Sequence, residues 1–310
     1  MKFVILGNTK LNYSWFVLTF RQGLLLNKHD VFEIDYRTNN VKQIKNKLMN
    51  LKADYCFTHL TFHLIHPLKN ILNVFFDVNK KVGTKFIHVL CDARHEPRYN
   101  SNISGAFYAA LLNQTHNLEK FRKYWGIPVF FMPYCSMTYK EMAKPVNELK
   151  YNFVFTGSMS HRKRTSFIKK LKNFDLKIIQ TQSKQDLRHR TLELAASAKA
   201  ILSLCTGYEI THYNEVRPWQ YLGAGACLLH KKFKGEDDLI PPEIYYEIDF
   251  DIKTVGEKLN LALTKDTMPM RKKAFAFMQR YHSSKERIKN VIACLEGKQT
   301  TTKSFLKELL

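Results

Sequence analysis

The chain lacks the features that mark disulfide-rich, membrane-spanning or secreted proteins. Its six cysteines among 310 residues lie far apart, and no C-x-x-C pair occurs. This spacing predicts reduced cysteines in the protein interior and argues against a disulfide framework or a zinc site. No apolar run approaches the roughly 20 residues that cross a bilayer, and the opening MKFVILG does not have the layout of a signal peptide. We therefore expect a cytoplasmic protein without a transmembrane segment.

Acidic residues are scarce relative to basic ones. The chain has 27 Asp and Glu against 49 Lys and Arg, a formal net charge of +22. A positive field of this size concentrates polyanions such as nucleic acid, an anionic membrane surface or phosphorylated small molecules. Because the basic residues are spread along the chain, a solvated basic surface is the competing interpretation, and net charge alone does not choose between them.

Two nucleotide-binding fingerprints are also absent. The sequence contains neither the G-x-G-x-x-G of dinucleotide-binding enzymes nor the G-x-x-x-x-G-K-[ST] of P-loop proteins. Dehydrogenase and P-loop kinase functions are therefore disfavoured. What remains is the composition of an ordinary globular protein, with 45% hydrophobic and 25% charged residues.

Short apolar runs alternate with helical stretches along the whole chain. This alternation predicts βαβ units with parallel strands and helices on both faces, and the length suits two domains. We predict an α/β fold of two Rossmann-like domains facing across a cleft, residues 1–146 and 147–310, with a polar linker that ends near Lys144-Pro145. The predicted strands are 2–7, 30–36, 54–57, 85–91 and 127–133 in the first domain, and 152–155, 176–180, 200–204, 227–229 and 245–250 in the second.

A glycine- and serine-containing turn follows the first strand of the second domain. It contains Gly157 and Ser158, and the helix predicted after it begins with Arg162 and Arg164. Helix amides and guanidinium groups together favour a phosphate ligand. The alternative is an ordinary capped helix with a basic first turn, but cations there oppose the helix dipole, which favours an anionic partner.

The stretch 208–230 places a second arginine near the same edge. Arg217 precedes a short helix and would hold a diphosphate from the other side, while Gln220, one turn on, offers a donor and an acceptor to ribose hydroxyls. In the alternative interpretation the helix faces the core, Trp219 and Leu222 pack there, and Arg217 pairs with Glu215.

In the first domain, Asp92 and Arg94 follow the end of a predicted strand. An aspartate at this edge would accept a proton from a hydroxyl group, with Arg94 orienting the acceptor or contacting a phosphate. His95 is the second candidate base because its unperturbed pKa suits proton transfer. A helix-capping role for Asp92 is the structural alternative.

Three histidines, His59, His63 and His66, recur at helical spacing. No carboxylate or cysteine accompanies them, so we prefer a polar loop bordering the acceptor over a metal site.

Three stretches that contain these residues resemble GT-B glycosyltransferases. They are FIHVLCDAR (86–94), FVFTGSMSHRKR (153–164) and AILSLCTGYEITHYNEVRPWQYLGAGACLL (200–229). Within GT-B enzymes the pattern is most similar to the phage DNA β-glucosyltransferases, which move glucose from UDP-glucose to 5-hydroxymethylcytosine in duplex DNA. The last two stretches are also similar to bacterial GT-B enzymes related to the spore-maturation type.

The resemblance implies an inverting transfer from a UDP-sugar, with UDP-glucose as the expected donor. Asp92 would be the general base, and Ser158, Arg162 or Arg164, and Arg217 would hold the diphosphate. The family places a glutamate on the ribose where this chain has Gln220. A divalent cation, Mg²⁺ or Mn²⁺, is expected at the diphosphate without a cage of protein ligands.

By the same resemblance, residues 1–146 would bind the acceptor and 147–310 the nucleotide-sugar, with the last helix, about 281–295, packing back on the first domain. The expected partner is hydroxymethylated double-stranded DNA, bound by a monomer, in the cytoplasm of an infected host if the chain is phage-encoded. Two alternatives stay open: a cell-surface or cell-wall glycosyltransferase working at an anionic membrane, and a non-catalytic DNA-binding protein. The candidate acceptor residues are Arg94, His95, Arg98, His59 and His63.

Overall fold

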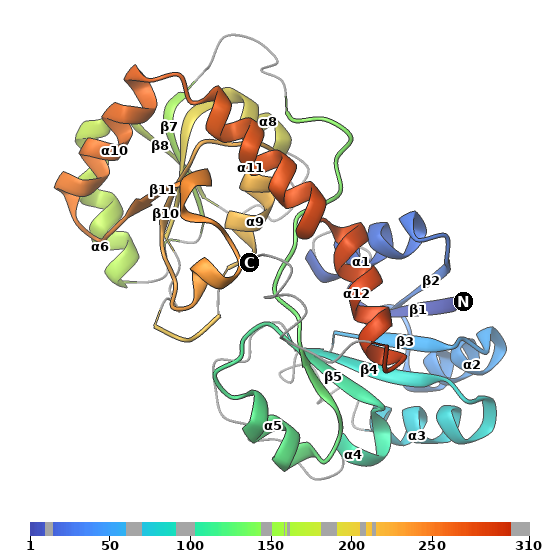
Figure 1. Ribbon diagram of the computed structural model, residues 1–310. Coiled ribbons are helices and arrows are strands. Elements are labelled where there is room, and N and C mark those ends of the chain that lie inside the picture. Colours follow the sequence, from blue (N-terminus) through green and yellow to red (C-terminus); the bar gives the residue numbers. More distant parts are fainter. Residues whose placement is uncertain are drawn as a thin grey trace. The chain divides into compact units, whose positions relative to one another are not determined.

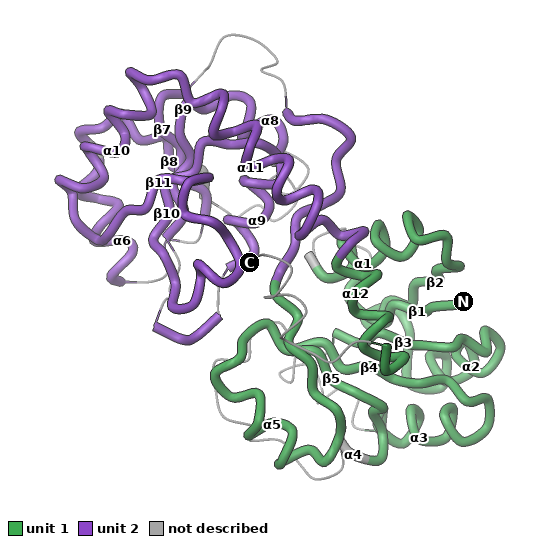
Figure 2. The backbone as a smooth tube through the Cα atoms, in the orientation of Figure 1, with its two compact units in different colours: residues 1–133, 287–308, 310 green, residues 134–286, 309 purple. Residues whose placement is uncertain are grey.

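In the computed structural model the chain forms two compact units, each built on a parallel β-sheet (Figures 1 and 2). Unit 1 comprises Met1–Pro133 and the chain from Arg287 onward, and unit 2 comprises Tyr134–Glu286. The structure describes residues 1–9, 15–59, 70–90, 103–143, 151–157, 159, 162–180, 191–204, 209–212 and 215–298.

In the residues described, the sheet of unit 1 has six strands in the order β2-β1-β3-β4-β5-β6, all parallel. The strands are β1 (Lys2–Gly7), β2 (Asp30–Asp35), β3 (Tyr55–Thr58), β4 (Lys85–Leu90), β5 (Ala109–Leu112) and β6 (Val129–Phe131). The helices of unit 1 are α1 (Trp15–Leu26), α2 (Val41–Leu51), α3 (Ile71–Val82), α4 (Ile103–Ala106), α5 (Leu118–Trp125) and the part of α12 (Ser284–Leu295) from Arg287.

Both faces of this sheet are covered, which is why its strands read as continuous apolar runs. On one face, Phe20 of α1 packs edge-on against Phe57 of β3, with ring centroids 4.8 Å apart. On the other face, Phe75 of α3 stacks on Phe86 of β4 at 4.3 Å. Helix α2 begins with a capping box, in which the Asn40 side chain accepts from the Gln43 amide and the Gln43 side chain accepts from the Asn40 amide.

In the part of the chain that the structure describes, the sheet of unit 2 has five strands in the order β11-β10-β9-β7-β8, also parallel. They are β7 (Tyr151–Gly157), β8 (Leu176–Gln180), β9 (Ala198–Ser203), β10 (Leu228–Lys231) and β11 (Tyr246–Ile248). The α-helices are α6 (Arg162–Lys170), α8 (Thr191–Ser197), α9 (Val216–Gly223), α10 (Ile252–Thr264) and α11 (Met268–Tyr281). The 3₁₀ turns are η3 (Leu171–Phe174), η4 (Glu236–Asp238) and η5 (Pro242–Ile244).

Helices α6 and α10 cover one face of this sheet, and α8, α9 and α11 cover the other (Figure 1). Phe153 and Phe155 of β7 point to the α6 and α10 side, where they join Phe167 and Val255 in a buried cluster. Alternate residues of one strand therefore supply a core on each face, as the continuous apolar run of β7 requires.

The predicted α/β fold of two Rossmann-like units is confirmed, with differences in detail. Strand β5 (Ala109–Leu112) was missed because AALL is a short run without the β-branched or aromatic side chains that favour strands. The helix predicted to begin at Arg162 ends at Lys170, and η3 follows it. At this point the chain changes from an α-helix to a 3₁₀ helix, and the spacing of apolar residues does not reveal such a change.

Neighbouring phenylalanines on α3 allow a test of which face is buried. Phe75→Ala is expected to lower the free energy of unfolding of unit 1 by about 3–5 kcal/mol, because it leaves a cavity against the sheet. Phe76→Ala removes a ring that is 52% exposed and should change this free energy by no more than about 0.5 kcal/mol. Urea unfolding measures both, and similar losses for the two variants would contradict the assignment of the buried face.

Candidate functional site

The candidate donor site lies in unit 2, at the edge of the sheet where the strands end. Strand β7 ends at Gly157, and α9 follows the neighbouring strand β9 in the chain, starting at Val216. Nη1 of Arg217, in the first turn of α9, donates a hydrogen bond to the Thr156 carbonyl at 2.6 Å. This bond fixes the guanidinium group at the carboxyl end of β7, the position where open α/β sheets bind ligands.

A single carboxylate joins two arginines at this edge. Oε2 of Glu215 pairs with Nη2 of Arg217, and Oε1 pairs with Nη2 of Arg164 on α6. The Arg164 side chain is 4% exposed, that of Glu215 14% and that of Arg217 22%. The three formal charges sum to +1, so the cluster retains a net positive charge while only Arg217 extends appreciably towards solvent.

Gly157 leaves the space that the Arg217 guanidinium occupies. A Cβ atom added at residue 157 would lie 2.0 Å from Nη1 of Arg217, and the backbone φ of +153° is one that side chains other than glycine rarely adopt. A residue with a side chain would therefore push the guanidinium away from the end of the strand.

Helix α9 presents its other side to the core. Trp219 and Leu222 are buried, and the buried hydroxyl of Tyr221 shares a hydrogen bond with Oγ1 of Thr156. Burial raises the pKa of Tyr221, against the opposing effects of the Arg217 charge and the Thr156 hydrogen bond. The core-facing packing weighed from the sequence is thus present, and it orients the helix that carries Arg217.

Gln220 contacts the backbone. Its Nε2 donates to the Cys135 carbonyl at 3.1 Å. A carboxylate at the same position would set two acceptors against each other, so an amide suits the surroundings better than the glutamate implied by the resemblance.

The segment that holds Gln220 runs along the end of α9. Ser136 lies where a Cβ at Gly223 would be, and Met142 lies where a Cβ at Gly225 would be. The Ala143 amide also donates to the Ala224 carbonyl at 3.2 Å. The glycines at the end of the helix therefore leave room for the side chains of Ser136 and Met142.

The two arginines at the start of α6 have different surroundings. Arg162 is exposed, whereas Arg164 is buried against Glu215. Arg164 would consequently influence a phosphate through Glu215, while Arg162 remains a candidate for direct contact. Ser158 lies outside the described residues.

Most of the candidates in unit 1 also lie outside the described residues: Asp92, Arg94, His95, Arg98 and His63. Strand β4 ends at Leu90, so Asp92 follows the carboxyl end of a central strand in sequence. His59, just after β3, has its ring 5.2 Å from that of Phe16. Burial, with a smaller effect from His59, lowers the pKa of the neighbouring His88 to about 3, so His88 is neutral at physiological pH.

Sequence reasoning missed the central role of Glu215. It named this residue only as a pairing partner of Arg217, because the 51 positions between Arg164 and Glu215 hide their contact. Among the described residues, no group of three or more His, Cys, Asp and Glu side chains is arranged to hold a metal ion. The described part also has no helix of the length and apolar character that a membrane crossing requires.

The whole chain is similar in fold to several glycosyltransferases. It matches HepE from Anabaena, solved with UDP and glucose, at a TM-score of 0.61 and 9% identity, covering 96% of this chain and 99% of that one. AviGT4, a glycosyltransferase involved in avilamycin A biosynthesis, matches at 0.56 and 13% identity, with 95% and 98% covered. The DNA-modifying enzyme β-glucosyltransferase, solved in the presence and absence of uridine diphosphoglucose, matches at 0.56 and 12% identity, with 100% and 99% covered.

These likenesses confirm the GT-B resemblance at the level of the fold. No protein-family model matches the sequence, and no curated protein matches it.

The bridging carboxylate gives a test of the site. Glu215→Gln is expected to destabilise unit 2 by about 3 kcal/mol, because it removes the carboxylate from a buried ion pair with Arg164. The matched change Glu243→Gln removes a pair with Lys273 in which both side chains are more than half exposed, and should cost no more than about 1 kcal/mol. Urea unfolding of unit 2 compares them, and a Glu215→Gln variant as stable as Glu243→Gln would contradict the buried bridge.

Proposed function

We propose that the protein is a glycosyltransferase that moves a sugar, with glucose as the expected one, from a UDP-sugar to a hydroxymethyl group on a pyrimidine of DNA. The observation that carries this proposal is the Arg217 guanidinium held at the carboxyl end of β7 by Thr156 and Glu215. Arginine is suited to diphosphate oxygens because its donors form a planar fork.

The fold supports the same donor class. The similar HepE structures were solved with UDP and glucose, with UDP and with UDP-glucose. For the acceptor, support comes from the DNA-modifying β-glucosyltransferase among the similar structures and from the +22 formal charge of this chain. A positively charged protein attracts a polyanionic acceptor such as DNA more strongly than a neutral glycan.

In the proposed reaction the acceptor hydroxyl oxygen attacks C1 of the sugar while the bond from C1 to the UDP oxygen breaks. Asp92 takes the hydroxyl proton, and UDP leaves with the electron pair of the broken bond. A single displacement of this kind inverts the configuration at C1. Arg217 and Arg162 would stabilise the negative charge that develops on the diphosphate.

A divalent cation at the diphosphate remains part of the proposal. The Glu215 carboxylate is committed to two arginines. Mg²⁺ or Mn²⁺ would therefore be held chiefly by diphosphate oxygens and water, as the hard character of these ions allows.

A second candidate function is non-catalytic DNA binding on the same fold. The observation in its favour is Gln220, whose amide is used to hold the Cys135 carbonyl. An amide also binds a ribose hydroxyl with less charge assistance than a carboxylate.

Transfer is tested with radiolabelled UDP-sugars and DNA that contains cytosine, 5-hydroxymethylcytosine or 5-hydroxymethyluracil. Label is expected only in hydroxymethylated DNA, and Asp92→Asn should lower its incorporation by about 10² or more because the base is lost. The exposed control Asp30→Asn should retain full transfer. If glycan or lipid acceptors tested in parallel were labelled and DNA were not, DNA would be ruled out as the acceptor. UDP binding without any transfer would favour the non-catalytic function.

Nucleotide binding is tested separately by calorimetry with UDP. Arg217→Ala is expected to weaken UDP binding by about 1.5–3 kcal/mol, the range for hydrogen bonds to charged groups. Arg280→Ala removes an exposed arginine of the same unit and should leave the affinity unchanged. Equal affinities for both variants would remove Arg217 from the donor site.

A further inference from the structure

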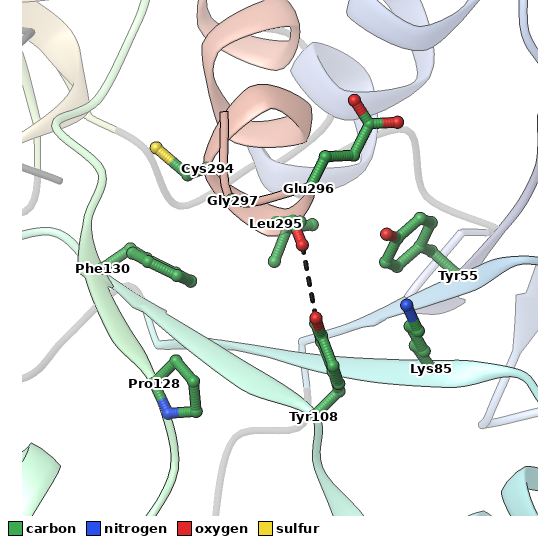
Figure 3. A pocket seen from close by; sticks show the side chains of 9 residues that line it. All are labelled: Tyr55, Lys85, Tyr108, Pro128, Phe130, Cys294, Leu295, Glu296 and Gly297. Atoms are coloured by element: carbon green, nitrogen blue, oxygen red, sulfur yellow. Dashed lines mark hydrogen bonds between the residues drawn. The ribbon is translucent and has the colours of Figure 1, made fainter. Parts of the chain in front are cut away.

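A pocket of about 470 Å³ opens in unit 1 (Figure 3). Tyr55, Lys85 and Tyr108 line one part of it, and Pro128, Phe130 and Leu295 line another. The volume lies within the range of sites for small organic ligands.

The pocket lies at the amino-terminal edge of the sheet. Tyr55 begins β3, Lys85 begins β4, Tyr108 immediately precedes β5 and Pro128 immediately precedes β6. Because these strands are parallel, their starts share one edge and their carboxyl ends share the other. The six residues of β4 separate the two edges by roughly 15 Å or more, at about 3.3 Å per residue.

A lysine ammonium is held in the pocket by aromatic rings. Nζ of Lys85 lies 4.6 Å from the centroid of the Tyr108 ring and 5.6 Å from that of Tyr55. No described acidic side chain forms an ion pair with Lys85, and the carboxylate of Glu296 pairs with Lys298 at 2.7 Å. The ammonium therefore keeps its capacity to donate to an anion.

The hydroxyl of Tyr55 is the second polar group. Tyr55 is 6% exposed, and no hydrogen bond joins its hydroxyl to a described residue, whereas the Tyr108 hydroxyl donates to the Leu295 carbonyl at 3.4 Å. In Figure 3 the Tyr55 hydroxyl points into the pocket near the Lys85 ammonium. This hydroxyl is therefore available to donate to an acceptor bound in the pocket.

Apolar side chains form another part of the lining, and Glu296, which pairs with Lys298, completes it. Pro128 and Phe130 project from the sheet side, and Leu295 projects from the end of α12 (Figure 3). We propose that this pocket binds a small organic anion with an aromatic body. Its acidic group contacts Lys85 and Tyr55, and its rings pack against Pro128, Phe130 and Leu295. Its described lining residues all belong to unit 1, and the proposal does not depend on the proposed transfer.

The test uses two fluorescent probes with the same aromatic body, applied to the full chain. 8-Anilinonaphthalene-1-sulfonate carries an anionic group, and N-phenyl-1-naphthylamine does not. Lys85→Met is expected to weaken binding of the sulfonate about tenfold or more and to change the affinity for the neutral probe less than twofold. Lys81→Met, which removes an exposed lysine of the same unit, should leave both affinities unchanged.

Tyr55→Phe keeps the ring and its packing, so it tests the hydroxyl without a large change in the pocket. It should weaken the sulfonate severalfold and leave the neutral probe unaffected. Equal effects of Lys85→Met on both probes, or no effect on either, would overturn the proposal. Displacement of the Lys85-dependent sulfonate by UDP would also overturn it, because the probe would then report on the donor site.

Discussion

The bridge from Glu215 to two arginines is the interaction on which the candidate donor site depends. Arg164 comes from α6 and Arg217 from α9, and without an anion between them their like charges would repel at close range. The carboxylate turns this repulsion into a link between the two helices. The Thr156 carbonyl then fixes the same guanidinium to β7. Helices α6 and α9 and strand β7 are thereby joined by polar interactions at the edge of the sheet, beyond the apolar core of unit 2.

The fold could be predicted from the sequence because each strand is marked by a short local pattern of residues. Short, continuous apolar runs such as those of β1 and β7 favour strands covered on both faces, and helices between parallel strands follow from that. Detail was lost where the local signal is weak, as in the four residues of β5, which have neither β-branched nor aromatic side chains.

The candidate site was only partly accessible from the sequence. Gly157 and Arg217 were expected at the same sheet edge, because a glycine at a strand end and an arginine at a helix start converge there, and the structure brings the two into contact. Arg162 and Arg164 were treated as equivalent, yet two positions on an α-helix differ by about 200° in direction. One is exposed and the other buried. The pocket of unit 1 was not foreseen, since Lys85 and Leu295 are brought together by tertiary packing alone.

Gly157 and Arg217 share one volume, since the guanidinium fills the space that any larger residue 157 would need. These two positions should therefore be linked in evolution. A chain that acquires a side chain at residue 157 has to lose or redirect the arginine, and a chain that first loses the arginine frees residue 157 to vary. Among related sequences, glycine at the first position and arginine at the second are expected to be retained or lost together.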